Sequence, residues 1–225
     1  MNEFEITGLT DSHIVKLGQP NCALHYEVVS SYLAMADAAR LDGIALQPCS
    51  AYRSFASQLQ IWNRKWRGER PLYGRDGLAL NYAELSPDQL LEAILTWSAI
   101  PGGSRHHWGS DLDLIDTAAV PAGYTVQLIP AEYATDGVFA RLTGWLNQHA
   151  IKFGFFRPYR TDRGGVIPEP WHFSYAPVSL SALESLSLAV LRRVLEQSEM
   201  AGKQLVLSRL PEIYTRFLLA VDSPV

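Results

Sequence analysis

The sequence predicts an α+β fold, in which helices flank a small, mostly antiparallel sheet and a helical extension ends the chain. Apolar residues recur at helical spacing in residues 27–41 and 55–66. Residues 111–115 alternate acidic and apolar side chains, residues 171–175 are rich in aromatic ones, and both patterns are typical of short strands. After Pro177 the helical spacing returns. Short strands mixed with separate helices favour this class.

The first quarter of the chain is expected to contain one helix and one strand. Residues 1–26 are predicted to be irregular, because glycine and proline interrupt them. The helix at 27–41 stops before Gly43, and residues 44–51 follow as a strand. Ser54 has the position of an N-cap for the second helix. The predicted buried stripe of that helix is Phe55, Leu59, Trp62 and Trp66.

The middle of the chain is expected to hold two long loops and two helices. Residues 67–85 form the first loop, of a length that often serves function. Ser86 begins a capping box with Gln89, which predicts a helix start there. Residues 117–135 form the second loop, with a short strand at 124–128, and a helix follows over residues 136–150.

The chain is predicted to divide at residue 176. Residues 1–176 are expected to form the domain that contains the motifs described below, and residues 177–225 a helical extension packed on the same domain. Two apolar stripes, within residues 179–200 and 210–221, predict two helices in the extension. The pair either packs as a hairpin on the core, leaving a monomer, or provides a face for a homodimer.

Composition fits an ordinary globular protein. The 225 residues are 48% hydrophobic and 19% charged, and the net charge is −4, which gives no reason to expect nucleic acid or an anionic membrane as a partner. The first residues lack the pattern of a signal peptide, and no apolar run approaches the ~20 residues of a membrane span. A cytoplasmic location is therefore expected. Cys22 and Cys49 form no metal motif and are expected to be free thiols or one bridge.

Two stretches contain the residues of a zinc site, Ser104 to Asp113 and Glu169 to His172. A catalytic zinc takes three nitrogen or oxygen ligands and keeps an open position for water, whose pKa falls to about 7. His106, Asp113 and His172 would supply two imidazoles and one carboxylate. A carboxylate near that water can take its proton, and Glu169 lies three residues before His172.

Strand alternation makes this arrangement feasible. In 111–115, Asp111 and Asp113 would share one face while Leu112 and Leu114 point to a core. His172 would share its face with Ser174, and Glu169 would approach the site from the preceding loop. Gly109 allows a turn before the first strand that a larger residue would resist.

Three motifs, in order along residues 50–175, resemble those of the zinc D-alanyl-D-alanine carboxypeptidase family, the VanY-like branch of the peptidases grouped with lysostaphin and the hedgehog zinc domain. They are Ser-x-His-x-x-Gly-x-x-x-Asp at 104–113, Glu-Pro-Trp-His at 169–172, and Ser50-Ala51-Tyr52-Arg53-Ser54 followed by Gln58. The resemblance implies that His106, and not its neighbour His107, joins Asp113 and His172 as zinc ligand. It implies Glu169 as the base.

The same resemblance implies roles for three further residues. Arg53 would stabilise the oxyanion, and Gln58 and Ser104 would line the substrate site. Structural roles compete with each, since arginine pairs with acids in loops and Ser and Gln cap loops routinely. The chain departs from the family where Asp111 replaces a small residue and where Ser174 replaces a frequent Arg. Asp111 would lie behind the metal ligands or alter metal affinity.

The expected function is a zinc-dependent D,D-carboxypeptidase that releases C-terminal D-alanine from peptidoglycan peptides ending in D-Ala-D-Ala. Its partner is then a small peptide or a stem peptide. A peptidoglycan endopeptidase or an L,D-carboxypeptidase of the same family is the related alternative. A zinc-stabilised binding module without turnover is the alternative from another class, and the presence of Glu169 argues against it.

Overall fold

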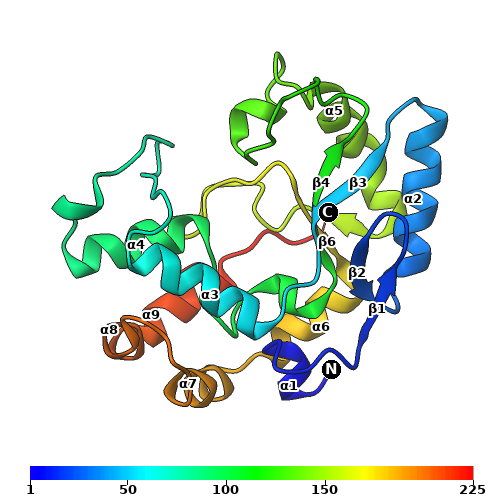
Figure 1. Ribbon diagram of the computed structural model, residues 1–225. Helices are drawn as coiled ribbons and strands as arrows, with labels where there is room; N and C mark the ends of the chain where they lie inside the picture. The colour runs from blue at the N-terminus through cyan, green and yellow to red at the C-terminus, as the bar shows by residue number, and fades with distance from the viewer. Residues whose placement is uncertain (225) are drawn as a thin grey trace.

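A computed structural model describes residues 1–224 and confirms the α+β fold (Figure 1). The main sheet has the strand order β3-β4-β6-β5, and all neighbouring strands are antiparallel. A separate antiparallel hairpin joins β1 and β2. The strands are β1 (Ile14–Leu17), β2 (Cys22–His25), β3 (Leu46–Ser50), β4 (Asp111–Asp116), β5 (Phe155–Phe156) and β6 (His172–Tyr175). The sheet is therefore the small antiparallel one that was expected.

Helices cover the sheet and extend the molecule to one side of it. The α-helices are α1 (Glu3–Ile6), α2 (Val29–Leu41), α3 (Phe55–Trp66), α4 (Pro87–Trp97), α5 (Ala140–His149), α6 (Ala176–Ser185), α7 (Leu188–Glu196), α8 (Lys203–Ser208) and α9 (Leu210–Ile213). The 3₁₀ helices are η1 (Tyr82–Glu84), η2 (Arg105–Trp108), η3 (Pro130–Tyr133) and η4 (Ala150–Phe153), and η5 (Tyr214–Leu219) is a π-helix. Ser54 and Ser86 cap α3 and α4, as their sequence context predicted. None of the helices within residues 1–224 combines the length and apolar character of a membrane crossing.

The prediction of an irregular N-terminus was wrong. Asn2 starts α1 through a capping box with Glu5, and the hairpin of β1 and β2 follows. Neither hairpin strand alternates cleanly between buried and exposed residues, so the local pattern contains little strand signal. Tertiary hydrogen bonds define the hairpin instead, since the amide of His25 donates to Gly109 O at 2.9 Å. Gly109 is left-handed (φ +65°), and a Cβ there would lie 2.4 Å from the Ile14 side chain.

Three further element predictions need correction. Residues 124–128 are coil instead of a strand, and the helix expected at 136–150 begins at Ala140. The single helix expected over 179–200 breaks near Leu186, because the Ser187 side chain accepts a hydrogen bond from the Val190 amide and starts α7 as a new helix. The helix expected at 210–221 is present, because α9 leads directly into the π-helix η5, which ends at Leu219.

Two hydrophobic cores lie on either side of the predicted zinc motif. The first joins α2, α5 and the sheet, and it includes Leu112 and Leu114 of β4. The second joins α3 and α4 to the C-terminal helices, and it includes Trp62 and Trp108. Residues 105–113 thus run from one core to the other, and the polar residues of this segment lie at their boundary. Figure 1 shows α2 and α5 on one side and α3, α4, α8 and α9 on the other.

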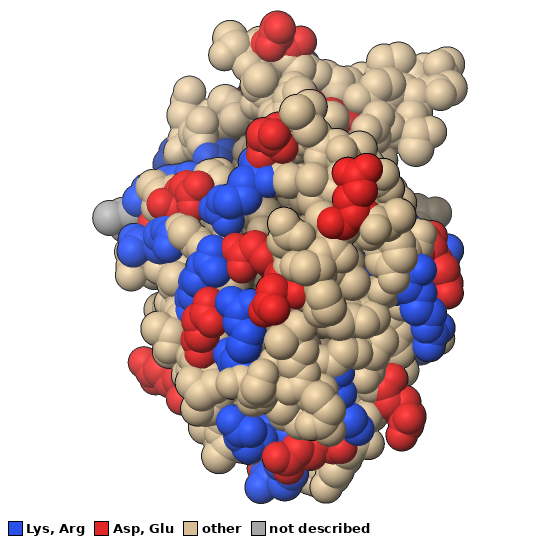
Figure 2. All heavy atoms as spheres, turned by 90° about the vertical axis from the view of Figure 1, so that its left-hand side faces the viewer, with Lys and Arg blue, Asp and Glu red and all other residues tan. Residues whose placement is uncertain are grey.

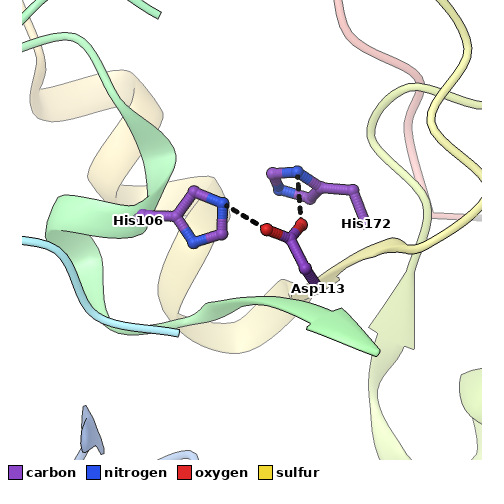
Figure 3. A group of neighbouring side chains, drawn as sticks. All are labelled: His106, Asp113 and His172. Atoms are coloured by element: carbon purple, nitrogen blue, oxygen red, sulfur yellow. Dashed lines mark ion pairs between the residues drawn. The ribbon is translucent and has the colours of Figure 1, made fainter. Parts of the chain in front are cut away.

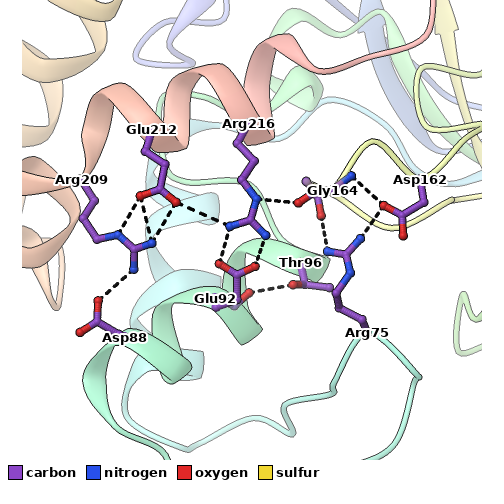
Figure 4. A network of polar contacts seen from close by, with 10 residues as sticks. Arg75, Asp88, Glu92, Thr96, Asp162, Gly164, Arg209, Glu212 and Arg216 are labelled. Atoms are coloured by element: carbon purple, nitrogen blue, oxygen red, sulfur yellow. Dashed lines mark hydrogen bonds and ion pairs between the residues drawn. The ribbon is translucent and has the colours of Figure 1, made fainter.

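Ion pairs connect the C-terminal segment to α4 and to the loop before Glu169 (Figure 4). Arg216 donates to both carboxylate oxygens of Glu92 and, through Nε, to Gly164 O at 2.6 Å. Arg75 donates to Gly165 O at 2.7 Å. Arg216 and Arg75 therefore hold this loop from two sides.

On the face that includes α4, basic and acidic side chains lie next to one another, and neither sign gathers in one large patch (Figure 2).

Asp222 holds the same loop near its start. Its carboxylate accepts from the amides of Arg160 (3.0 Å) and Thr161 (2.8 Å) and from Arg163 Nη2 (2.8 Å). Burial alone would raise the pKa of Asp222, but the ion pair with Arg163 and the hydrogen bonds from Thr161 and Arg160 outweigh it and lower the pKa to about 2. The carboxylate is only 3% exposed.

Replacing Asp222 by Asn should lower the free energy of unfolding by about 1–3 kcal/mol at pH 7, since a buried charged acceptor is lost. The unfolded carboxyl has a pKa near ~3.9. Its stabilising effect is thus present above that pH and is lost as the pH falls toward 2. Urea unfolding of both metal-free proteins at pH 7 and pH 3 measures this, and the difference should shrink at pH 3. Equal stability at pH 7 would contradict the role.

Candidate metal centre

The structure brings His106, Asp113 and His172 together (Figure 3). One ligand atom from each lies within 4.8 Å of the others. His106 belongs to η2, while Asp113 of β4 is the direct antiparallel partner of His172 in β6. Their exposed fractions are 7%, 5% and 4%, so the group is buried.

The ring of His106 is fixed from behind by a backbone carbonyl. Its Nδ1 lies 2.8 Å from Ala51 O, and a carbonyl can only accept, so Nδ1 holds the proton. Nε2 then has a free lone pair, and it lies 3.4 Å from Asp113 Oδ2. Burial, and after it the charge of Arg53, lowers the pKa of His106 well below its usual range. A neutral imidazole is the form that binds a metal.

The ring of His172 is fixed from behind by a carboxylate. Its Nε2 lies 3.0 Å from Asp111 Oδ1, which leaves Nδ1 directed at the group. Nδ1 lies 3.5 Å from Asp113 Oδ1 and 3.0 Å from Glu169 Oε2. Burial lowers the pKa of His172, but the hydrogen bonds with Asp111 and Glu169 and the charge of Asp113 outweigh it and raise the pKa to about 10. The surroundings of this ring thus favour positive charge.

The donor set fits a divalent cation. Asp113 Oδ1 is buried and has no hydrogen-bond partner among residues 1–224. Burial raises the pKa of Asp113 to about 6, because the charge of His172 offsets it only in part. A divalent cation that replaces the proton on His172 Nδ1 would bind both imidazoles and satisfy this carboxylate. Two imidazoles and one carboxylate are a zinc donor set, with each imidazole oriented by an acceptor on its other nitrogen.

Glu169 lies against the group, as the sequence predicted. The chain turns between Glu169 and His172, where the His172 amide donates to Glu169 O at 3.2 Å, and this turn directs the carboxylate inward. Pro168 and Pro170 flank Glu169, and its amide donates to Tyr159 O at 2.9 Å. Glu169 is 9% exposed, and its Oε2 lies 3.0 Å from His172 Nδ1.

Arg53 and Gln58 are in direct contact, and Gln58 is the more deeply buried of the two. Arg53 donates to Gln58 Oε1 and to Ser50 Oγ, both at 2.8 Å. Gln58 is 1% exposed, and its side-chain Nε2 donates to Ala99 O at 2.7 Å. Burial lowers the pKa of Arg53, and the charges of Asp113 and Glu169 oppose this shift. Gln58 therefore orients Arg53. Ser104 is 2% exposed and immediately precedes η2.

His107 uses both ring nitrogens elsewhere. Nδ1 lies 2.6 Å from Arg53 O, and Nε2 accepts from the Gly102 amide at 3.0 Å. The residue is fully buried, and burial lowers its pKa to about 4. It connects the loop of Arg53 to the loop before η2, and it faces away from the group of His106.

Sequence reasoning missed Arg105. Its Nε donates to Asp111 Oδ1 at 2.7 Å and its Nη2 to Ser174 Oγ at 2.6 Å, and it is 4% exposed. Burial raises the pKa of Asp111, but Arg105 and the hydrogen bonds with His172 and Ser110 hold it well below its usual range. Two of the positions that depart from the family pattern, Asp111 and Ser174, thus meet through Arg105. These two departures are the sequence signal that could have pointed to it.

Replacing Asp111 by Ala should weaken zinc binding about 10–100-fold, because the carboxylate behind His172 is lost. The same change leaves Arg105 buried without an acid, which lowers stability for a separate reason. The double variant Asp111→Ala/Arg105→Leu separates the effects: it should regain stability but keep the weak zinc affinity. Competition with a chromophoric chelator measures the affinity. Wild-type affinity in the double variant would contradict the role of Asp111.

Comparisons with known proteins agree with this geometry. A model of the VanY family, described as D-alanyl-D-alanine carboxypeptidase, matches residues 21–178. A protein of Haemophilus influenzae without an assigned function is 31% identical over 126 residues, which are 55% of this chain and 96% of that protein. A D-alanyl-D-alanine carboxypeptidase of Enterococcus faecalis is 29% identical over 154 residues, 67% of this chain and 47% of that protein.

Solved structures share the fold. VanYB in complex with D-Ala-D-Ala has a TM-score of 0.55 and 21% identity, and the match covers 84% of this chain and 91% of that one. A vancomycin-resistance D,D-pentapeptidase VanY variant in complex with Zn(II) has a TM-score of 0.52 and 24% identity, with 76% and 82% coverage. The family match spans all three sequence motifs and the group around His106. The chain belongs to the VanY family of D-alanyl-D-alanine carboxypeptidases.

Proposed function

We propose that this protein is a zinc-dependent D,D-carboxypeptidase that releases the C-terminal D-alanine from peptidoglycan stem peptides ending in D-Ala-D-Ala. The observation behind the proposal is that a carboxylate, Glu169, lies 3.0 Å from the inward nitrogen of His172. That nitrogen belongs to a three-residue donor set suited to zinc. A base beside a metal site is what hydrolysis of an unactivated amide requires.

The roles follow from the contacts. His106, Asp113 and His172 would hold zinc, which when bound polarises the scissile carbonyl and makes water acidic. Glu169 takes the proton of the attacking water and returns it to the departing amine. Arg53, held by Gln58 and Ser50, directs a fixed positive charge toward the oxyanion. Ser104, immediately before η2, would contact the substrate.

Positive charge near Glu169 favours removal of a terminal residue over internal cleavage. Burial, and after it the charge of Arg70, lowers the pKa of Lys65 to about 8, and Lys65 also interacts with the charges of Glu169 and Arg53. Its Nζ donates to Ser98 Oγ at 2.7 Å, beside the carbonyl of Ala99 that holds Gln58. A free terminal carboxylate, absent from an internal bond, would be attracted to these cations.

Product analysis on three substrates tests the proposal. The zinc-loaded protein is incubated with a stem pentapeptide ending in D-Ala-D-Ala, with the corresponding tetrapeptide, and with a cross-linked peptide. We expect one D-alanine from the pentapeptide and little from the other two. Cleavage of the tetrapeptide alone would indicate an L,D-carboxypeptidase, and an internal cut would indicate an endopeptidase. Tight binding without any product would indicate the binding module.

A further inference from the structure

A cleft of about 370 Å³ lies beside the loop of Glu169. Both long loops contribute to it, through Arg75 of the first, which the sequence suggested as functional, and Pro130 of the second. Its remaining lining residues come from the segment 157–170, and they include the two prolines that flank Glu169. A ligand in the cleft would therefore contact the neighbours of the proposed base.

Three arginines and one acid line this cleft: Arg75, Arg157, Arg160 and Asp162. Arg75 and Asp162 pair at 2.7 Å, so the other two guanidinium groups account for the net positive charge. Neither has a carboxylate partner among the ion pairs of the described residues. Burial lowers the pKa of Arg157, and the nearby charge of Arg160 lowers it further.

Hydrogen bonds fix the guanidinium of Arg157 but leave one of its nitrogens without a partner among the described residues. Its Nη1 donates to Asn147 Oδ1 at 2.6 Å and its Nε to Pro170 O at 3.2 Å, while the guanidinium lies over the Phe173 ring. Nη2 is buried without a hydrogen-bond partner within residues 1–224. Arg160 is exposed, and its backbone amide, but not its guanidinium, is hydrogen-bonded within the described part of the chain. One guanidinium is thus oriented in advance, and the other is free to close on a ligand.

The cleft is connected to the candidate metal centre through Tyr159. This residue lines the cleft, and its ring meets the His172 ring edge-on with 5.1 Å between centroids. The cations near the proposed position of the terminal carboxylate, Arg53 and Lys65, come from other segments and do not line the cleft. Two separate positive regions therefore lie near Glu169.

We propose that the arginine cleft binds a carboxylate on the acyl part of the substrate, upstream of the bond that is cut. The inference rests on the proposed function, in which the departing residue is a single alanine. The carboxylate of that alanine would bind at Arg53 and Lys65. An extended peptide advances about 3.3–3.6 Å per residue, so a side chain two or three residues upstream can reach past Pro170. Arginine suits this ligand, because its planar donors match a carboxylate in pairs.

Kinetics with a matched pair of peptides test the inference. Both peptides end in D-Ala-D-Ala, and the two residues before the alanines are glutamate in one and glutamine in the other. We expect the glutamate peptide to have a KM lower by about tenfold, the effect of one charge-assisted hydrogen bond. Arg160→Gln should remove this preference, so that the two peptides have the same KM. Arg40→Gln, a remote exposed arginine on α2, should behave as wild type.

Three outcomes would overturn the proposal. The first is an equal KM for both peptides in the wild-type protein. The second is a glutamate preference that survives in both Arg160→Gln and Arg160→Glu. The third is phosphate binding in the cleft. If inorganic phosphate competes with both peptides alike, and does so only while Arg160 is present, the cleft takes a phosphate-bearing ligand and the carboxylate assignment is wrong. Unchanged thermal unfolding of the Arg160 variants shows that they fold.

Failure of the proposed function is distinguishable from failure of this inference. If neither peptide is cleaved, their affinities for the zinc-loaded protein, measured by calorimetry, test the role of the cleft without requiring turnover. Tighter binding of the glutamate peptide, lost in Arg160→Gln, would support the cleft even for a protein with another activity. Equal binding, or binding of neither peptide, would refute it.

Discussion

Replacing Glu169 by Gln should lower kcat by about 10²–10⁴-fold, the range for loss of a positioned general base. The amide is nearly the size of the carboxylate but cannot take a proton from water. Because His106, Asp113 and His172 remain, the variant should still bind one zinc per chain. Steady-state release of D-alanine and metal analysis of the same sample measure both effects.

A control for this variant is Glu184→Gln, an exposed glutamate on α6 outside the motifs. It removes the same charge and should keep wild-type kcat. If Glu169→Gln retained wild-type kcat with zinc bound, the base would have to be another group. Loss of zinc in that variant would instead assign Glu169 a role in holding the metal.

Replacing His106 by Ala should abolish both zinc binding and turnover. Two donors remain, and several kcal/mol of transition-state stabilisation by the metal are lost, which corresponds to about 10³-fold or more in rate. The matched control is His149→Ala at the end of α5, which removes a histidine distant from the group. Zinc content after gel filtration and alanine release are the readouts.

Chelation distinguishes a missing metal from a damaged fold. Wild-type protein stripped of metal should lose activity and regain it on addition of zinc. His106→Ala should not regain activity at any zinc concentration that leaves the protein soluble. Recovery of the variant at high zinc would indicate that Asp113 and His172 suffice, and the assignment of His106 would be wrong.

Local signals explain why much of the fold was predictable. Ser54 and Ser86 start helices through hydrogen bonds to residues three positions away, so their effect is visible in any short window. The N-terminal hairpin has no such signal, because it depends on the contact of His25 with Gly109 far along the chain. The break before Ser187 was missed because apolar spacing continues across it, although the serine itself is an ordinary N-cap.

The candidate site also contains some features that local sequence patterns predict and others that only the fold creates. Alternation in β4 predicted that Asp111 and Asp113 share a face, and both contact the ring of His172. The acceptor behind His106 is a backbone carbonyl, that of Ala51, which no side-chain pattern can reveal. Arg105 pairs with Asp111 across the bend at Gly109, so only the fold brings the two together.

The most direct test of a one-zinc hydrolase built from His106, Asp113, His172 and Glu169 is a titration of metal-free protein with zinc, with D-alanine release from a D-Ala-D-Ala-ending pentapeptide measured at each step. We expect the rate to rise in proportion to added zinc and to stop rising at one equivalent per chain. Full activity of the metal-free protein, or no activity at one bound equivalent, would contradict a one-zinc mechanism.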